Sequence, residues 1–289
     1  MNKSIFSGAC TALVTPFLDG KVNYPMAEQL VLRQIAAGIR TVILAGTTGE
    51  APTLSDEEKI TLVRRCKELV GDQCHIIAGT GSNATQHTLE LSVKAQQAGA
   101  DGLLIVSPYY NKANPDGLFV HYWTIAQAVN IPIIIYNVPS RTGMDIPVSV
   151  YEQLSKQPNI MGVKEANTDI RKIARTIAVC GPDFGVWSGN DDMIVPVMAL
   201  GGQGVISVLS NIYPAETAAI CDACLANDYI RAASLQLKMM DAIGNLFCEV
   251  NPIPVKYASR LIGLDCGSCR LPLTELTDEN KKKLQEFFA

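Results

Sequence analysis

The sequence is poor in the residues and motifs that most often build metal and cofactor sites. It has three histidines among 289 residues, His75, His87 and His121, and none has a metal-ligand spacing such as His-x-x-x-His. It also lacks a Gly-x-Gly-x-x-Gly segment after a strand and a Gly-x-x-x-x-Gly-Lys-Ser/Thr loop. We therefore expect neither a metal ion nor an organic cofactor.

A strong charge of one sign and long apolar runs are absent as well. The chain has 24 Lys and Arg residues against 28 Asp and Glu residues, a net charge of −4. Such a chain has no general attraction for nucleic acid or anionic lipid. No run of 18 apolar residues occurs, and the first eight residues, MNKSIFSG, lack the apolar core of an export signal. The sequence predicts a cytoplasmic protein without a membrane or nucleic-acid partner.

Cysteine, in contrast, is plentiful, with nine residues that include two Cys-x-x-Cys pairs. Two such pairs can hold zinc, because thiolates at this spacing occupy adjacent tetrahedral corners. Cys221 and Cys224, however, fall in a helical run without the glycine turn of a zinc ribbon, and Cys266 and Cys269 form the second pair. We expect reduced cysteines that fill the core, with a zinc or redox role as the alternative.

Short β-branched runs alternate with longer segments of helical periodicity from about residue 8 to residue 225. The eight strand candidates are Ala9–Thr15, Thr41–Ala45, His75–Ala78, Gly102–Val106, Ile133–Tyr136, Ile160–Lys164, Gly185–Ser188 and Val205–Val208. The helix candidates between them include Ser55–Val70, Ala84–Ala98, Pro115–Val129, Pro147–Lys156, Thr168–Val179 and Asp191–Leu200. Continuous apolar strands indicate a parallel sheet, and eight βα units favour a closed (β/α)8 TIM barrel.

The strand pattern ceases after residue 226, and three more helices are predicted at Asp228–Phe247, Pro254–Ile262 and Asp278–Phe288. We predict a catalytic barrel over residues 1–226 and a C-terminal helical domain over residues 227–289 that packs against it. Local signals support the helices. Ser55 and Glu58 have capping-box spacing, and the glycines at positions 38, 99 and 201 are predicted to end helices in the left-handed conformation.

Lys164 is the residue with the clearest chemical potential. In TIM-barrel enzymes the active site lies at the C-terminal ends of the strands, and Lys164 ends an otherwise apolar run there. A poorly solvated position disfavours the ammonium form, and the neutral amine can form a Schiff base with a ketone. The alternative is a lysine that reaches solvent or pairs with Glu165. Tyr136 ends the preceding strand and favours the first interpretation, since its phenol can move the protons of imine formation.

Two further segments suit carboxylates. Thr47 and Thr48 lie in a glycine-flanked turn whose amides and hydroxyls suit a small carboxylate. Arg141 can bind a second carboxylate in bidentate fashion. Taken singly, the threonines belong to an ordinary tight turn and the arginine to the surface. Together with Lys164 they predict an enzyme that activates a small keto acid.

Six segments occur in an order that is familiar from one family. They are Gly46-Thr-Thr-Gly-Glu50, Pro108-Tyr-Tyr-Asn-Lys112, Tyr136-Asn-Val-Pro-Ser-Arg-Thr-Gly143, Val163-Lys-Glu-Ala166, Gly201-Gly-Gln-Gly-Val-Ile-Ser207 and Asn251-Pro-Ile-Pro-Val-Lys256. Together they resemble the 4-hydroxy-tetrahydrodipicolinate synthase (dihydrodipicolinate synthase) family of the class I aldolase superfamily. The resemblance runs from about Gly8 to Pro272 and implies a homotetramer built from tight dimers.

The resemblance also implies roles for the site residues. Lys164 would condense with pyruvate, and Tyr136, Thr48 and Tyr110 would form a proton relay, with Tyr110 reaching into the neighbouring subunit's site. Thr47 and Thr48 would hold the pyruvate carboxylate, and the backbone of Ile206 would line the same pocket. Arg141 would bind the carboxylate of L-aspartate 4-semialdehyde.

Other activities share this fold, among them N-acetylneuraminate lyase and keto-deoxy-sugar-acid aldolases. Arg141 favours the synthase, because the neuraminate lyase pattern lacks that arginine. A barrel that binds a keto acid without turnover is the alternative from another class. Intact Lys164, Tyr136 and Thr48 argue against it.

The resemblance implies an effector site for L-lysine as well, near the segment after Glu50. Asn83 and Tyr109 are retained there. Lysine-sensitive members carry histidines at the positions of Asp56 and Lys59 and a glutamate at that of His87. The chain therefore lacks the carboxylate that grips the effector's ammonium and gains a repelling cation in Lys59, with Asp56 in partial compensation. We predict an enzyme that is insensitive to lysine.

Overall fold

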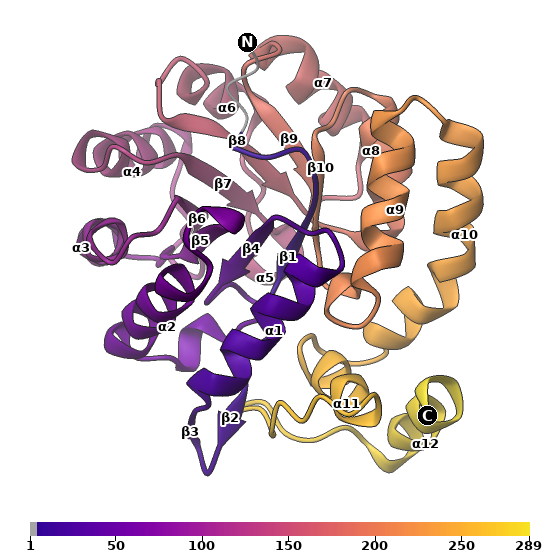
Figure 1. Ribbon diagram of the computed structural model, residues 1–289. Helices are drawn as coiled ribbons and strands as arrows, with labels where there is room; N and C mark the ends of the chain where they lie inside the picture. The colour runs from indigo at the N-terminus through magenta and orange to yellow at the C-terminus, as the bar shows by residue number, and fades with distance from the viewer. Residues whose placement is uncertain (1–4) are drawn as a thin grey trace.

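The β-branched runs form eight parallel strands that close into a barrel in the computed structural model, which describes residues 5–289 (Figure 1). The hydrogen-bonded order around the barrel is β1, β10, β9, β8, β7, β6, β5 and β4. The strand bounds are β1 Gly8–Ala12, β4 Thr41–Leu44, β5 His75–Gly79, β6 Gly102–Val106, β7 Ile133–Asn137, β8 Ile160–Glu165, β9 Gly185–Ser188 and β10 Gly204–Ser207. Each strand overlaps its predicted range, and the predicted (β/α)8 barrel is confirmed.

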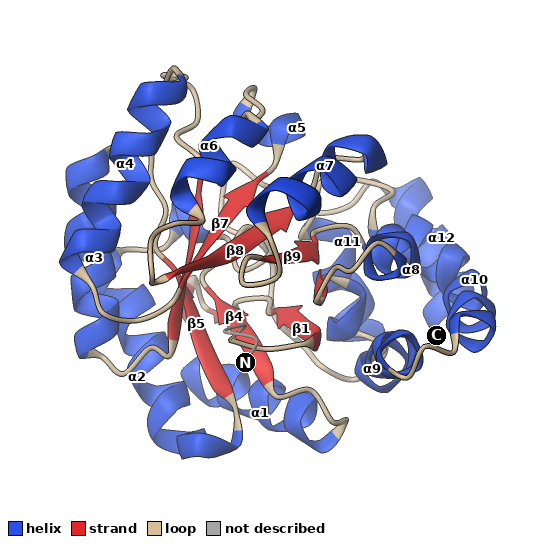
Figure 2. Ribbon diagram, turned by 90° about the horizontal axis from the view of Figure 1, so that it is seen from above, coloured by secondary structure: helices blue, strands red, loops and turns tan. Residues whose placement is uncertain are grey.

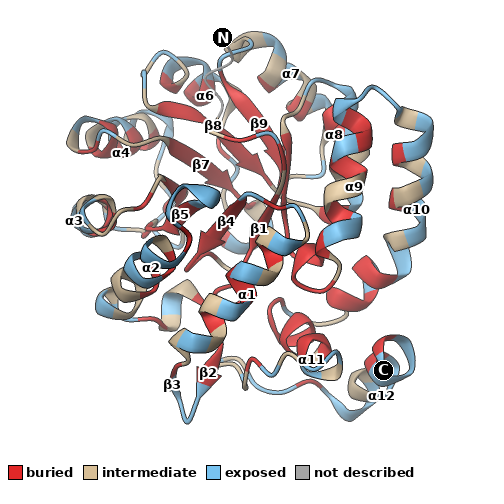
Figure 3. Cartoon of the chain, viewed as in Figure 1, coloured by how far each residue is buried: buried red, intermediate tan, exposed pale blue. Residues whose placement is uncertain are grey.

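The strands are apolar because both of their faces are covered. Every residue of β4, β7, β8, β9 and β10 is buried (Figure 3). One face packs under the helices, and the other fills the barrel interior. Phe6, which precedes β1, stacks on Trp187 inside the barrel with ring centroids 4.9 Å apart. This pair fills part of the barrel interior.

Helices form the outer layer of the barrel, as the view from above shows (Figure 2). Their bounds are α1 Tyr24–Ala36, α2 Asp56–Val70, α3 Thr85–Gln97, α4 Pro115–Ala128, α6 Val148–Leu154, α7 Ile170–Cys180, α8 Ile194–Ala199 and α9 Pro214–Leu225. The capping box is present, with the Glu58 backbone N–H donating to Ser55 Oγ and the Ser55 N–H donating to Glu58. Gly38, Gly99 and Gly201 have φ values of 94°, 94° and 99°, so the predicted helix ends are confirmed.

Three further helices follow the barrel, α10 Tyr229–Leu246, α11 Ile253–Leu261 and α12 Asp278–Phe288. We refer to them as the C-terminal helices. Helix α10 packs against α8 and α9, and α11 packs against α12. In Figure 1, α11 lies below the barrel, on the side of the short hairpin formed by β2 (Phe17–Leu18) and β3 (Lys21–Val22). Within residues 5–289, no helix is long and apolar enough to cross a membrane.

The structure departs from the predicted elements at a few places. The hairpin β2–β3, α1 and the one-turn helix α5 (Pro139–Thr142) lie outside the predicted ranges. The helix predicted at Asp191–Leu200 is divided into the 3-10 turn η3 (Asp191–Met193) and α8. Asp191 is buried, and its carboxylate accepts bonds from the backbone N–H groups of Val208 and Leu209. The first turn is therefore tied to the residues that follow β10.

Candidate active site

Lys164 and Tyr136 lie side by side inside the barrel. They are directly paired in the register of β7 and β8, and Lys164 Nζ lies 4.4 Å from the centroid of the Tyr136 ring. Lys164 is 4% exposed and Tyr136 is 6% exposed. Among residues 5–289, no carboxylate lies within ion-pair distance of Lys164 Nζ. The amine is thus shielded from solvent and has no carboxylate at ion-pair distance, which suits a nucleophile.

Glu165, the expected alternative partner of Lys164, faces away from it. Its carboxylate accepts bonds from Asn137 Nδ2 at 2.7 Å, from the Tyr151 hydroxyl at 3.1 Å and from the Asn167 N–H at 2.9 Å. Burial raises the pKa of the Glu165 carboxyl above its usual value. Since successive residues of a strand point to opposite faces, this outer network holds the ends of β7 and β8 together while Lys164 points inward.

The two threonines of the turn after β4 have different surroundings. Thr47 is half-buried and lines a cavity of about 450 Å³ at the C-terminal end of the barrel, which we call the mouth cavity. Thr48 is 2% exposed, and its Oγ1 accepts a bond from Asn251 Nδ2 at 3.0 Å. The Glu50 N–H donates to the Thr47 carbonyl at 3.0 Å and closes the turn.

Arg141 reaches the same cavity from α5. Together with Thr47 and Tyr136 it lines the mouth cavity, and its Nη2 donates to the backbone carbonyl of Asn251 at 3.1 Å. The groups that line the cavity therefore include a turn that could bind a carboxylate, a phenol and a guanidinium.

Ile206 and Tyr110 lie apart from these groups. Ile206 is fully buried on β10, in the interior cluster that also contains Tyr136. Tyr110 is 90% exposed, has a φ of 71° in the left-handed region, and is not among the residues that line the cavity of its own chain. The structure brings Lys164, Tyr136, Thr47 and Arg141 to one end of the barrel but leaves Tyr110 pointing outward.

A comparison with known families decides the relationship. The model of the dihydrodipicolinate synthetase family matches residues 5–288. The chain belongs to the dihydrodipicolinate synthetase family. Its similarity to individual proteins also covers nearly the whole chain. A 4-hydroxy-tetrahydrodipicolinate synthase from Acetivibrio thermocellus is 46% identical over 99% of this chain and 97% of that protein.

Solved structures of the dihydrodipicolinate synthetase family agree with the fold. The dihydrodipicolinate synthase from Aquifex aeolicus is 41% identical, with a TM-score of 0.96 over 97% of this chain and 96% of that chain. The chloride-inhibited enzyme from Acinetobacter baumannii, solved in complex with pyruvate, is 40% identical, with a TM-score of 0.95 over 97% of both chains.

The cysteines of this family member are mostly core residues. Cys221 and Cys224 lie on α9 and are 0% and 2% exposed, as expected for core filling. Burial raises the pKa of Cys266 to about 11 and that of Cys269 to about 12. In the part of the chain that the structure describes, no group of three or more potential ligand side chains could hold a metal ion.

Three residues in or beside the turn from Gly46 to Glu50 have no role predicted from the sequence. Glu50 is buried, and its carboxylate accepts bonds from Lys256 Nζ and from the Arg270 N–H, both at 2.8 Å. Asn251 is 5% exposed and contacts both Thr48 and Arg141. The only available signal was their membership of two of the six motifs, Gly46–Glu50 and Asn251–Lys256.

Proposed function

We propose that the chain condenses pyruvate with L-aspartate 4-semialdehyde through an imine on Lys164. The product is 4-hydroxy-tetrahydrodipicolinate, an intermediate of lysine and diaminopimelate biosynthesis. Family membership over residues 5–288 supports the reaction. The observation that carries the site assignment is the buried Lys164 amine, unpaired among residues 5–289 and beside the Tyr136 ring.

The chemistry needs one nucleophile and a way to move protons. The neutral Lys164 amine attacks the ketone carbon of pyruvate, and the resulting carbinolamine loses water to form the imine. Loss of a methyl proton gives the enamine, whose carbon attacks the aldehyde of the second substrate. The substrate's own amine then displaces Lys164, which closes the ring and frees the enzyme. Tyr136, beside the amine, is positioned to carry protons in these steps.

The geometry favours Thr47 over Thr48 as the threonine of the proton relay. The resemblance had suggested Thr48, together with Tyr136 and Tyr110. The Thr48 hydroxyl oxygen, however, already accepts a hydrogen bond from Asn251, so that this hydroxyl keeps only its proton to donate. Thr47 instead lines the mouth cavity with Tyr136. We assign the relay hydroxyl to Thr47 and keep the amides of both threonines and the Thr48 hydroxyl for the pyruvate carboxylate. The backbone of Ile206 completes that pocket.

A direct assay tests the proposed reaction. Purified protein is incubated with pyruvate and L-aspartate 4-semialdehyde, and product formation is followed through a coupled reductase. A parallel reaction contains N-acetylneuraminate and monitors the release of pyruvate. We expect turnover in the first reaction only. Turnover of the sugar acid with none of the aldehyde would overturn the substrate assignment.

Arg141 is proposed to bind the carboxylate of the aldehyde substrate. Arg141→Ala should still trap pyruvate, but the KM for L-aspartate 4-semialdehyde should rise about 10- to 100-fold, because a charge-assisted hydrogen bond contributes about 1.5–3 kcal/mol. Arg171→Ala, which removes an exposed arginine paired with Asp169, serves as control. Loss of pyruvate trapping with an unchanged aldehyde KM would reverse the assignment.

We further propose a homotetramer of tight dimers that works in the cytoplasm. An aromatic side chain that is 90% exposed on a left-handed backbone position suits a group that enters a neighbouring subunit, as proposed for Tyr110. Mixing inactive Tyr110→Phe chains with inactive Lys164→Ala chains should then restore activity, because mixed dimers contain one complete site. No rescue after verified subunit exchange would contradict a shared site.

Insensitivity to lysine remains our prediction for the effector site. Asp56, Lys59 and His87 line the mouth cavity together with Tyr109. The Asp56 carboxylate lies 3.0 Å from His87 Nε2, so the one added carboxylate already has a partner. Titration of lysine into the coupled assay should give half-inhibition only above about 1 mM, equivalent to an affinity weaker than about 4 kcal/mol. Half-inhibition at lower concentration would show that the retained Asn83 and Tyr109 suffice.

A further inference from the structure

The segment Asn251–Lys256 leads into α11, the second of the C-terminal helices, yet two of its side chains contact the turn that follows β4. Asn251 Nδ2 donates to Thr48 Oγ1 across 203 positions of the sequence. The backbone carbonyl of the same residue accepts the bond from Arg141. Asn251 therefore joins the two proposed carboxylate sites, one through its side chain and the other through its backbone.

Lys256, one turn into α11, holds the other end of that turn. Its Nζ lies 2.8 Å from the Glu50 carboxylate, and the two side chains are 3% and 0% exposed. Glu50 has a φ of 55°, so the turn ends on a residue in the left-handed region. Such backbone conformations persist where surrounding contacts determine them. The ion pair with Lys256 and the bond from the Arg270 N–H are contacts of this kind.

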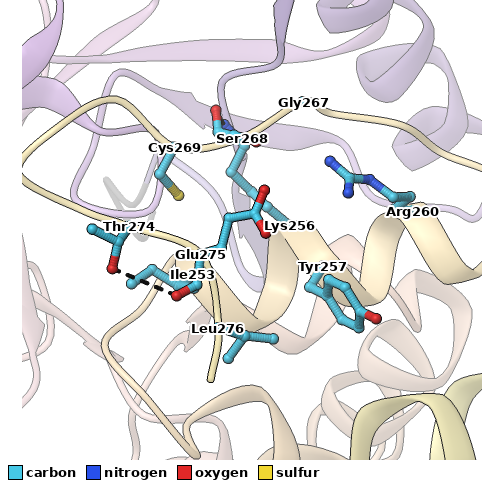
Figure 4. Close-up of a pocket in the computed structure, with 10 residues that line it drawn as sticks. All are labelled: Ile253, Lys256, Tyr257, Arg260, Gly267, Ser268, Cys269, Thr274, Glu275 and Leu276. Atoms are coloured by element: carbon cyan, nitrogen blue, oxygen red, sulfur yellow. Dashed lines mark hydrogen bonds between the residues drawn. The ribbon is translucent and has the colours of Figure 1, made fainter. Parts of the chain in front are cut away.

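Lys256 makes two further contacts, one with the C-terminal region and one with β2. Its Nζ also donates to the Ser268 carbonyl at 3.1 Å and lies 4.3 Å from the centroid of the Phe17 ring. Figure 4 shows Lys256 on α11 beneath the loop that carries Ser268 and Cys269. An ammonium held on three sides has little freedom to follow a displaced carboxylate. The position of Glu50 is thus determined by the C-terminal helices and not by the barrel alone.

We propose that Asn251 and Lys256 are positioning residues for pyruvate, which act by holding the turn from Gly46 to Glu50 in its carboxylate-binding form. This inference rests on the proposed assignment of Thr47 and Thr48 to the pyruvate carboxylate. It gives a function to the motif Asn251-Pro-Ile-Pro-Val-Lys256. It also makes the C-terminal helices part of the active site, although the imine-forming residues all lie in the barrel.

The proposal is tested by the KM values for pyruvate and for L-aspartate 4-semialdehyde, which should respond differently to substitution of Asn251. Asn251→Ala removes the bond to Thr48 but keeps the carbonyl that Arg141 uses. We expect the KM for pyruvate to rise about tenfold, as for loss of one buried hydrogen bond, and the KM for L-aspartate 4-semialdehyde to change much less. The pyruvate concentration for half-maximal borohydride trapping should rise in parallel. Asn251→Leu keeps a side chain of similar size that can neither donate nor accept a hydrogen bond, and it should give the same difference.

Lys256→Met should raise the pyruvate KM as well, but it also leaves the Glu50 charge buried without a partner. The double variant Glu50→Gln/Lys256→Met separates the two effects. It should regain thermal stability relative to Lys256→Met and still keep the raised pyruvate KM. A merely structural role would instead let the pyruvate KM recover together with the stability, and that result would overturn the proposal for Lys256.

Two matched controls lie in the same part of the chain. Asn280→Ala removes an asparagine that bonds to Glu249, and Lys281→Met removes a lysine that pairs with Glu275 at the surface. Both should leave the two KM values unchanged. An unchanged pyruvate KM in folded Asn251→Ala and Asn251→Leu, or an equal rise of both KM values, would contradict the inference.

Thr47→Val and Thr48→Val distinguish this failure from that of the underlying assignment. If both variants leave the pyruvate KM unchanged, the threonine hydroxyls do not bind pyruvate, and the assignment of the Thr48 hydroxyl to its carboxylate is wrong. If they raise it while Asn251→Ala does not, only the positioning role is wrong.

Discussion

Replacing Lys164 with alanine should abolish pyruvate trapping and lower kcat/KM by at least about 10³-fold, because removal of a covalent nucleophile costs orders of magnitude in rate. The parent protein, reduced with borohydride in the presence of pyruvate, should gain a single pyruvate-derived group per chain. Peptide mapping by mass spectrometry should locate that group on Lys164. The barrel should stay folded, since alanine adds no buried polar group at this position.

Lys112→Ala is the matched control for this experiment. Lys112 lies in the exposed loop after β6, so its loss should leave imine formation intact. Attachment of the pyruvate group to Lys112 or to another lysine, or the absence of any adduct in the parent, would overturn the imine mechanism on Lys164.

Tyr136→Phe should lower kcat by about 10²- to 10⁴-fold, the usual contribution of a positioned acid or base. The ring beside the Lys164 amine is retained, so pyruvate should still bind and only the proton transfers should slow. Pre-steady-state trapping should therefore show slower formation of the imine with an unchanged final amount. Steady-state kinetics in the coupled assay gives the fall in kcat.

Tyr229→Phe removes a phenol of the same kind outside the site. Its hydroxyl donates to the Met198 carbonyl between α10 and α8, and we expect no change in kcat. If Tyr136→Phe also left kcat unchanged, another group would have to carry the protons, and the relay would need to be reassigned.

The barrel could be predicted from the sequence because the two signals on which this prediction rests are local. Strands such as β7 and β8 are runs of apolar residues buried on both faces, and glycines with positive φ end the helices that precede β4, β6 and β10. Apart from α1, which has 13 residues, the elements that were missed are short. The hairpin β2–β3 and the helix α5 have two to four residues per element, too few for a periodic pattern.

Lys164 and Tyr136 could be placed together from the sequence because consecutive strands of a barrel are neighbours. Each of the two residues lies near the C-terminal end of its strand, and the register pairs them directly. The distinction between Thr47 and Thr48 needed the structure. The sequence of a tight turn does not tell which of two adjacent threonines faces the cavity. Only the contact with Asn251 shows that Thr48 faces the C-terminal helices.

The sequence by itself thus determined the barrel, the order of its strands and the chemical groups at its C-terminal end, because periodicity and strand-end positions are properties of neighbouring residues. Tertiary structure alone decided which groups hold these residues in place. Asn251 reaches Thr48 and Lys256 reaches Glu50 across 203 and 206 positions, and Glu165 turns away from Lys164 toward Asn137. Such contacts depend on how the C-terminal helices close over the barrel, and no local pattern encodes the partner of a buried polar side chain.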